Sequence, residues 1–553
     1  MQPADTADRV RLVPLGGFGQ IGANCLTIEI DKRILVVDCG VIFPSEPKSG
    51  VEIKHPPFDY LVDKKEDIAA IVITHGHEDH VGALPFLLSE LDIAVFTDRY
   101  TSKIIASRLE EYNIDKKHLI NIIEPEQSID AGGFKITPFY IPHSINGNFA
   151  FFATRNGVGF FHSSDFKLNV TQNKSSAKLI KKIENFSREN APVNLMITDS
   201  TGALEDEPAG SEAEVKDAID TIVKNYRGRV FVVLFSSNVE RINNLGSIAR
   251  KYGFKLVLSG KSVVTNYYRA VEHKICDSYD DILISENDAG KYPLDKMLLL
   301  LSGTQGEKRS SLGRLAFNNH SKMSVQPGDT VVFSSRFIPG NEINISKAIN
   351  ALLEQGAEVL HTKNSESNIH VSGHGSINEI ETLIKLIRPE NVLPAHGTFE
   401  FMSRVDKLCS SLDINSLVLK NGECAFLTDG KLEKSDCVIN SGKVSRCSGG
   451  FIIDESVLSE RKKIGTTGVV SINVFLPADL ENLVKIAVDS LGLFSLDLKA
   501  QKHIEIVSLV NSVLEKNTMN EILKLKKVIF TEVRRYVKSQ TGFKASVIIS
   551  IEN

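Results

Sequence analysis

The chain has 553 residues, of which 42% are hydrophobic and 24% are charged, as in ordinary globular proteins. Such a length predicts roughly three to four domains. The formal net charge of −5 at pH 7 excludes a uniformly basic nucleic-acid binder. A polyanionic ligand would therefore need a local positive surface or a bound metal ion.

The sequence predicts no targeting or membrane segment. The start, MQPADTADRV, lacks a basic region followed by an apolar one, and the run KMLLLLSG is far shorter than the roughly 20 residues that span a bilayer. The seven cysteines form no CxxC pair, which is typical of reduced thiols. We expect a cytoplasmic protein that contacts no membrane.

The N-terminal part predicts an α/β architecture. Short apolar strands alternate with glycine-rich turns between residues 10 and 45, and helix-like segments follow at 83–91 and 101–112. Asn156-Gly157 lies between two apolar runs and predicts a β-hairpin. Interleaved strands and helices are typical of layered α/β folds.

Between residues 211 and 355 the pattern changes to alternating helices and strands, which is typical of βαβ units around a parallel sheet. The segments AEVLHTK and ENVLPAHGTFE then return to the first pattern, in which each strand ends in a polar cluster. The middle segment is therefore predicted to be a second α/β domain inserted into the first.

Beyond about residue 435 the composition turns to Ser, Gly and Lys, and the rest of the chain predicts a small α+β domain. Its predicted elements are a strand at 468–476, helices at 501–515 and 519–540, and a strand at 544–551. The predicted domain segments are 1–208, 209–355, 356–450 with a linker, and 451–553.

The stretch THGHEDHVGAL, residues 74–84, directly follows the apolar run AAIVIT. We expect its polar part to form a loop, because a helix would point residues i and i+2 to different sides. Imidazole and carboxylate groups suit Zn²⁺, and a catalytic ion needs only three protein ligands. His75, His77, Asp79 and His80 already offer four, so the motif predicts two ions. Glu78 is expected to be a solvated neighbour.

Further ligands are predicted where isolated polar residues follow other apolar runs. These candidates are His143, Asp165 and His396. Asp38, in ILVVDCG, lies at another predicted strand end and is predicted to orient a ligand imidazole from outside the cluster. His162 is expected to be structural, which is the more common role of a lone histidine at a strand end.

The motif HGHEDH, together with Asp38, His143 and Asp165, resembles the metallo-β-lactamase fold family. The segments TDST (198–201), IHVSGHGS (369–376) and PAHG (394–397) resemble its β-CASP subgroup of nucleic-acid phosphodiesterases. With LGGFGQIGANC, SGTQGE and VVFSSRFIPGNE, the chain is most similar to the ribonuclease J family over about residues 10–440. This resemblance implies an α/β fold: a metallo-β-lactamase αββα sandwich with an inserted β-CASP α/β domain and a small C-terminal α+β domain.

The resemblance also implies roles for the site residues. One Zn²⁺ would be held by His75, His77 and His143, the other by Asp79, His80 and His396, with Asp165 bridging; Mn²⁺ or Mg²⁺ are possible replacements. Asp199 and His374 fall in further family motifs. The implied catalytic residues are Asp79, Asp165, Asp199 and His374, and His374 is the candidate proton donor to the departing 3′-oxygen.

Two segments are implied to bind the nucleotide phosphate through hydroxyl, imidazole and backbone N–H groups. They comprise Ser237, Asn238, Val239, His370, Val371, Ser372, Gly373 and His374. A compact anion site of this kind fits a 5′-monophosphate more easily than a triphosphate. Arg241 and Arg336 are either further phosphate contacts or surface ion pairs.

The chain also departs from the family pattern. Ser163-Ser164-Asp165 stands where the family usually has Thr-Gly-Asp, Gln20 replaces a usual Glu, and SGTQGEKR lacks the usual proline after QGE. These changes remove none of the expected metal ligands. The segment SGVEIKHPPF departs so far that no structural calcium site is predicted.

The expected function is a zinc-dependent 5′–3′ exoribonuclease and endoribonuclease that acts on single-stranded RNA in mRNA decay and rRNA maturation. Metal-activated hydroxide would attack phosphorus and leave a 5′-phosphate on the downstream product. The substrate would preferably carry a 5′-monophosphate, and the protein would form a homodimer or tetramer. The open alternatives are a β-CASP nuclease that acts on DNA and a non-catalytic RNA-binding subunit of a degradation complex.

Overall fold

The computed structural model describes residues 10–44, 50–169, 174–190, 192–226, 228–338, 340–476, 484–516 and 522–552. These residues form two compact units. One holds the described residues before 45 and those from 53 to 444, and the other holds residues 50–52 and those from 445 onward. In the described part of the chain, no helix is long and apolar enough to span a membrane.

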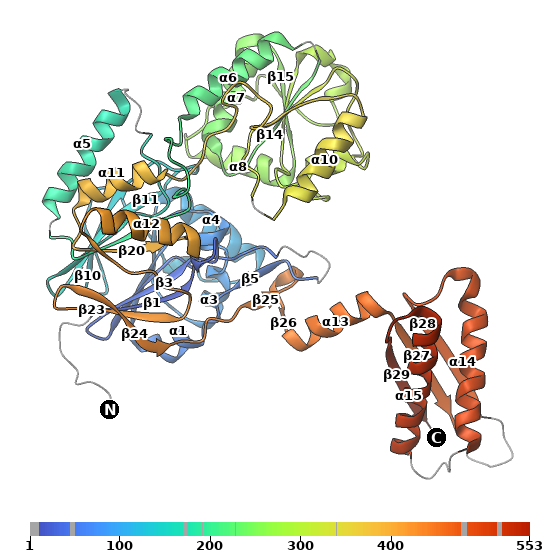
Figure 1. The fold of residues 1–553 in the computed structure, drawn as a ribbon. Helices are drawn as coiled ribbons and strands as arrows, with labels where there is room; N and C mark the ends of the chain where they lie inside the picture. The colour runs from blue at the N-terminus through green and yellow to red at the C-terminus, as the bar shows by residue number, and fades with distance from the viewer. Residues whose placement is uncertain are drawn as a thin grey trace. The chain divides into compact units, whose positions relative to one another are not determined.

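Two sheets packed face to face form the core of the first unit (Figure 1). The first sheet has the strand order β24 (Lys431–Val438), β23 (Glu423–Thr428), β1 (Val10–Gly16), β3 (Cys25–Ile30), β4 (Arg33–Val37), β6 (Ile68–Val72), β7 (Val95–Thr97), β8 (Ile120–Ile122). The second has the order β22 (Asn415–Ser416), β20 (Asn391–Ala395), β13 (Leu195–Asp199), β12 (Val158–His162), β11 (Phe149–Arg155), β10 (Phe134–Tyr140), β9 (Ile129–Ala131).

Helices cover the outer faces of both sheets. Because side chains alternate along a strand, one set of apolar residues, including Ile28 and Phe151, packs between the sheets while the other set faces the helices. The helices of the first sheet are α1 (Asp59–Asp63), α3 (Leu84–Glu90) and α4 (Arg99–Glu111). Those of the second are α5 (Lys174–Glu189), α11 (Ile377–Ile387) and α12 (Phe399–Ser411). The expected αββα sandwich and the Asn156-Gly157 hairpin between β11 and β12 are confirmed.

An inserted α/β layer separates β13 from β20 along the chain. Its parallel strands have the order β16 (Leu283–Ile284), β15 (Lys255–Ser259), β17 (Met297–Leu301), β14 (Val230–Val233), β18 (Thr330–Phe333), β19 (Glu358–Leu360). One face packs on α6 (Glu212–Asn225), α7 (Val239–Tyr252) and α8 (Lys261–Glu272), and the other on α9 (Ser311–Ala316) and α10 (Glu342–Glu354). The sheet continues past residue 355, because AEVLHTK supplies its edge strand β19 rather than a strand of the sandwich.

The second unit contains a hairpin of β25 (Val444–Arg446) and β26 (Ile452–Ile453), helix α13 (Glu455–Thr467) and a sheet with the order β28 (Lys485–Leu491), β27 (Val469–Phe475), β29 (Ser546–Glu552). Helices α14 (Leu496–Lys516) and α15 (Ile522–Thr541) pack on one face of this sheet. The sequence did not predict α13 or β28. Neither element has the pattern of buried apolar residues by which a helix or strand is predicted from sequence. Helix α13 has no buried residue, and β28 buries only Ser490.

Candidate metal centre

The predicted ligands converge because parallel strands of both sheets end at one place. β4 pairs in parallel with β6, and Asp38 and His75 follow their carboxyl ends. β12, β13 and β20 are likewise parallel neighbours, and Asp165, Asp199 and His396 lie at or just beyond their ends. The carboxyl ends of parallel strands are a common location for functional sites.

The HGHEDH motif is only partly a loop, which corrects the sequence-based expectation. His75 and His77 lie outside helices and strands, but Glu78–Val81 forms a helical turn, α2, with His77 in extended backbone at its N-cap. Acidic residues at positions 78 and 79 favour such a turn, because carboxylates are stabilised at a helix N-terminus. Glu78 is not simply solvated, since its half-buried carboxylate pairs with Arg108 of α4.

One group of potential ligand atoms combines three imidazoles with a carboxylate. The ligand atoms of His75, His77, His143 and Asp165 all lie within 4.8 Å of one another. His77 Nδ1 lies 3.1 Å from His75 Nε2 and 3.2 Å from His143 Nε2. A tetrahedral ion with ligands at about 2.0–2.1 Å requires ligand atoms about 3.3 Å apart. The donor set and its spacing therefore fit a divalent metal ion.

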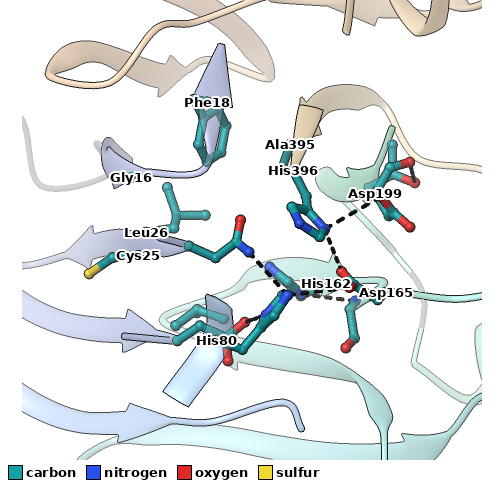
Figure 2. A pocket seen from close by; sticks show the side chains of 15 residues that line it. Gly16, Phe18, Cys25, Leu26, His80, His162, Asp165, Asp199, Ala395 and His396 are labelled. Atoms are coloured by element: carbon teal, nitrogen blue, oxygen red, sulfur yellow. Dashed lines mark hydrogen bonds and ion pairs between the residues drawn. The ribbon is translucent and has the colours of Figure 1, made fainter. Parts of the chain in front are cut away.

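A second group consists of Asp79, His80 and His396. Asp79 Oδ2 lies 3.1 Å from His396 Nε2 and 3.7 Å from His80 Nε2. Asp165 lies between the two groups, because its Oδ2 is 3.3 Å from His80 Nε2 and 3.6 Å from His143 Nε2. Figure 2 shows His80, Asp165 and His396 pointing toward one another from separate segments of the chain.

Four of the imidazoles have one ring nitrogen in the cluster and the other against a neighbouring group. The pairs are His75 Nδ1 with Thr74 Oγ1 (3.0 Å), His77 Nε2 with Ser237 Oγ (3.2 Å), His80 Nδ1 with Asp38 Oδ2 (2.8 Å) and His143 Nδ1 with Gly373 O (2.6 Å). Such outer partners fix the tautomer and the orientation of a metal-ligating ring. Asp38 is itself held by the Thr74 N–H at 2.8 Å.

The electrostatics of the first group favour neutral imidazoles. Burial lowers the pKa of His77 to about 4 and holds the pKa values of His75 and His143 well below the ordinary histidine value. A neutral imidazole offers a lone pair, which is the form that binds a metal ion.

In and beside the second group, neighbouring charges outweigh the effect of burial on the pKa values. Burial alone would raise the pKa of Asp165, but the imidazoles of His396 and His80 outweigh it and hold that pKa well below its usual range. Burial alone would lower the pKa of His396, but Asp165 outweighs it and raises that pKa to about 10. The buried Asp165 carboxylate is thus stabilised by nearby positive charge, which protons on these rings or divalent cations would supply.

His374 lies beside the cluster as the partner of Asp199. Its Nδ1 is 2.7 Å from Asp199 Oδ2, and Asp199 Oδ1 accepts the Thr201 N–H at 2.8 Å. Burial alone would lower the pKa of His374, but Asp199 and Asp165 outweigh it and raise that pKa. The side chain keeps 21% of its surface exposed, so a protonated ring can meet a bound ligand.

Several residues expected to bind substrate have their side chains inside the fold. Val239 and Val371 belong to the buried core, so they offer a ligand only their backbone. Asn238 caps α7 by accepting the Arg241 N–H and donates to Glu212. The Ser372 hydroxyl accepts the His374 N–H, whereas Ser237 lies against His77 as described above.

Arg241 is neither an exposed phosphate contact nor a surface ion pair, which are the two roles that the sequence left open. It is 2% exposed and bonds to Glu212, to the Ser334 carbonyl at 2.7 Å and to His370 Nδ1 at 3.0 Å, so it holds the predicted phosphate-binding segments in place. Arg336 is a surface ion pair with Glu205 at 3.0 Å, with 46% of its side chain exposed.

Comparison with known proteins finds three related domains along the chain. Residues 33–231 match the family described as beta-lactamase superfamily domain, residues 227–352 match ribonuclease J, beta-CASP domain, and residues 364–419 match Zn-dependent metallo-hydrolase RNA specificity domain. The chain is 30% identical to ribonuclease J of Helicobacter pylori strain J99, covering 96% of this chain and 76% of that protein. It is 32% identical to ribonuclease J of Thermus thermophilus, covering 97% of this chain and 94% of that protein.

The chain belongs to the ribonuclease J family. Members of this family combine a metallo-hydrolase core with a β-CASP domain, and the chain is accordingly a metal-dependent nuclease. A crystal structure of a protein of unknown function from Enterococcus faecalis V583 shares the fold, with a TM-score of 0.51 and 14% identity over 76% of this chain and 100% of that one.

Sequence reasoning missed two amide side chains that contact the residues of the candidate metal centre. Asn24 Nδ2 lies 3.0 Å from His80 Nε2, and Asn148 donates to the Asp165 carbonyl at 2.7 Å. Both amides are buried, Asn24 in the segment GAN and Asn148 in the segment NGN. Buried amides are usually hydrogen-bonded, but the sequence does not reveal their burial or their partners.

Proposed function

We propose that the chain is a zinc-dependent ribonuclease that degrades single-stranded RNA from its 5′ end and also cleaves internally, in mRNA decay and rRNA maturation. The observation that carries this proposal is the two neighbouring ligand groups, with Asp165 Oδ2 3.3 Å from His80 Nε2 of one and 3.6 Å from His143 Nε2 of the other. His75, His77 and His143 would hold one Zn²⁺, and Asp79, His80 and His396 the other. Histidine-rich, thiol-free donor sets of this kind suit zinc, with Mn²⁺ as a possible replacement.

Bound zinc ions would supply a water of lowered pKa and positive charge beside the phosphoryl oxygens. The protein's own part is to position the phosphodiester and to handle the leaving group. His374, held by Asp199 through Nδ1, would donate a proton to the departing 3′-oxygen. The downstream RNA fragment would then carry a 5′-phosphate.

The segments around residues 237–239 and 370–374 would bind the phosphate of the nucleotide at the 5′ end. The side chains of Asn238, Val239 and Val371 are buried, and the N–H groups of Asn238, Val239 and His374 donate within the protein. The contacts would therefore come from Ser372, the His374 ring and the other backbone N–H groups of these segments. These groups form a small site that suits a monophosphate better than a triphosphate. RNA as substrate is supported by the relatives named ribonuclease J and by the RNA specificity domain match.

The proposal includes a homodimer or tetramer formed through the second unit. Large apolar side chains there are solvent-exposed, including Leu491 (68%), Ile504 (66%) and Leu523 (80%). Exposed apolar residues of this size are typical of protein interfaces when they form a patch. Light scattering on the purified chain measures the assembly directly.

The activity is tested with zinc-loaded protein and RNA oligonucleotides that carry a 5′-monophosphate or a 5′-triphosphate, beside a DNA of the same sequence. We expect nucleoside 5′-monophosphates from the monophosphorylated RNA and slower release from the other two. Asp79→Ala combined with His80→Ala should abolish cleavage, because it removes two ligands of one ion. Undiminished cleavage by that double variant would refute the proposal.

A further inference from the structure

In the described structure, the Ser237 hydroxyl brings the inserted β-CASP layer into contact with the candidate metal centre. His77 Nδ1 lies among the ligand atoms, 3.1 Å from His75 Nε2 and 3.2 Å from His143 Nε2. The opposite nitrogen, His77 Nε2, lies 3.2 Å from Ser237 Oγ. The outer partners of His75, His80 and His143 come from the sandwich and from the HVSGH segment, whereas Ser237 comes from the inserted sheet.

We propose that Ser237 is a positioning residue for the metal centre, and that the β-CASP layer thereby completes the ligand set. Ser237 Oγ accepts the Nε2–H of His77, which leaves the Nδ1 lone pair directed at the cluster. This inference rests on the proposed ligand role of His77. It assigns Ser237 a role in metal binding that does not depend on RNA.

The backbone around Ser237 is held rigidly enough for this role. Ser237 follows β14, a central strand of the inserted sheet, and precedes the first turn of α7. The Asn238 N–H donates to the Phe235 carbonyl at 3.0 Å, and the Asn238 side chain accepts the Arg241 N–H. Arg241 is in turn fixed by Glu212. The hydroxyl is thus presented from a fixed turn, as an orienting partner requires.

This positioning role can be distinguished from direct RNA binding by experiment. A hydroxyl that only touches the substrate changes RNA affinity and leaves metal affinity unchanged. A hydroxyl that fixes a ligand ring changes metal affinity in the absence of RNA, and loss of such a partner typically weakens metal binding about 10- to 100-fold. The two roles therefore differ in a binding experiment that contains no RNA.

The test is a zinc titration of metal-free protein against a chromophoric chelator, without RNA. Wild type, Ser237→Ala, Ser237→Thr and Ser236→Ala are compared. Ser236 is the matched control, because it lies in the same turn and its carbonyl, which the variant retains, accepts a hydrogen bond from the Asn266 side chain. We expect Ser237→Ala to bind one zinc about 10- to 100-fold more weakly, Ser237→Thr to recover most of that loss, and Ser236→Ala to match wild type.

A second readout is the visible absorption of the Co²⁺-loaded protein, which reports ligand geometry and should change in Ser237→Ala only. Wild-type zinc affinity and an unchanged cobalt spectrum in Ser237→Ala would overturn the inference, even if its KM for RNA rose. Failure of the proposed function gives a different result, because the wild-type protein would then bind no zinc or release no nucleotides.

Discussion

His374 and Asp199 act as one unit at the edge of the cluster, so their effect on catalysis should depend on the leaving group. We expect His374→Ala to lower kcat on RNA by about 10²- to 10⁴-fold while zinc content is unchanged. A 4-nitrophenyl phosphodiester has a leaving group that needs no proton, so its hydrolysis should fall far less. Equal losses on both substrates would exclude His374 as the proton donor.

Arg241 has neither of the two roles that the sequence left open for it, a phosphate contact or a surface ion pair, but is a buried structural residue. Its guanidinium forms two hydrogen bonds with the buried Glu212 carboxylate, at 3.0 and 2.6 Å. Burial alone would raise the pKa of Glu212, but Arg241 outweighs it and lowers that pKa. The partners lie 29 and 129 residues away in sequence, so no local pattern could predict this network.

Glu212→Ala should destabilise the protein by about 3–5 kcal/mol, because it leaves the Arg241 charge buried and unpaired. The matched control is Asp220→Ala, which removes a more exposed ion pair, with Lys251 at 2.8 Å, and a hydrogen bond from Tyr252 at 2.9 Å, and should cost only about 1–2 kcal/mol. Urea unfolding followed by circular dichroism measures both. Similar small losses in the two variants would show that the Glu212–Arg241 pair contributes little.

At the scale of elements, helix α4 carries a titratable N-cap. Asp98 is 2% exposed and accepts the backbone N–H groups of Tyr100 and Thr101. Burial raises the pKa of Asp98 to about 6, above the unfolded value of about 3.9. The nearby Tyr100 and Tyr140, whose pKa values burial raises to about 12, do not titrate in this range.

The folded state therefore binds more protons at Asp98 than the unfolded state between about pH 4 and pH 6. The stability that this group contributes is fully present below about pH 4 and is lost as the pH rises through about 6. Asp98→Asn keeps the cap acceptor without the charge. We expect its free energy of unfolding to gain about 2–3 kcal/mol over wild type between pH 4 and pH 7. An offset that is independent of pH would contradict this prediction.

Element types were predictable wherever hydrophobic periodicity and turn residues agreed, as in the β11–β12 hairpin and helices α6 and α7. The HGHEDH segment was predicted as a loop because its ligands must converge. The structure meets that need with a loop for His75 and His77 and a helical turn for Asp79 and His80. Strand β19 was misplaced because its three residues carry no signal of which sheet they join.

At the scale of the whole molecule, the two-sheet architecture was expected from the family resemblance, and the grouping of distant ligands from polar residues that follow apolar runs. His143, Asp165 and His396 do lie beside the HGHEDH segment, at the joint edge of both sheets. The outer contacts of the ligand rings were not predictable, apart from Asp38. They depend on how the inserted layer and the HVSGH segment approach the sandwich, as Ser237 and Gly373 illustrate.

The central claim is that these side chains hold two zinc ions in a ribonuclease. Anomalous diffraction at the zinc absorption edge from crystals of the zinc-loaded protein tests it most directly. The account predicts two anomalous peaks, one among His75, His77 and His143 and one among Asp79, His80 and His396, with Asp165 contacting both. Loaded crystals with no anomalous peak at this cluster, or with these side chains directed away from the peaks, would contradict it.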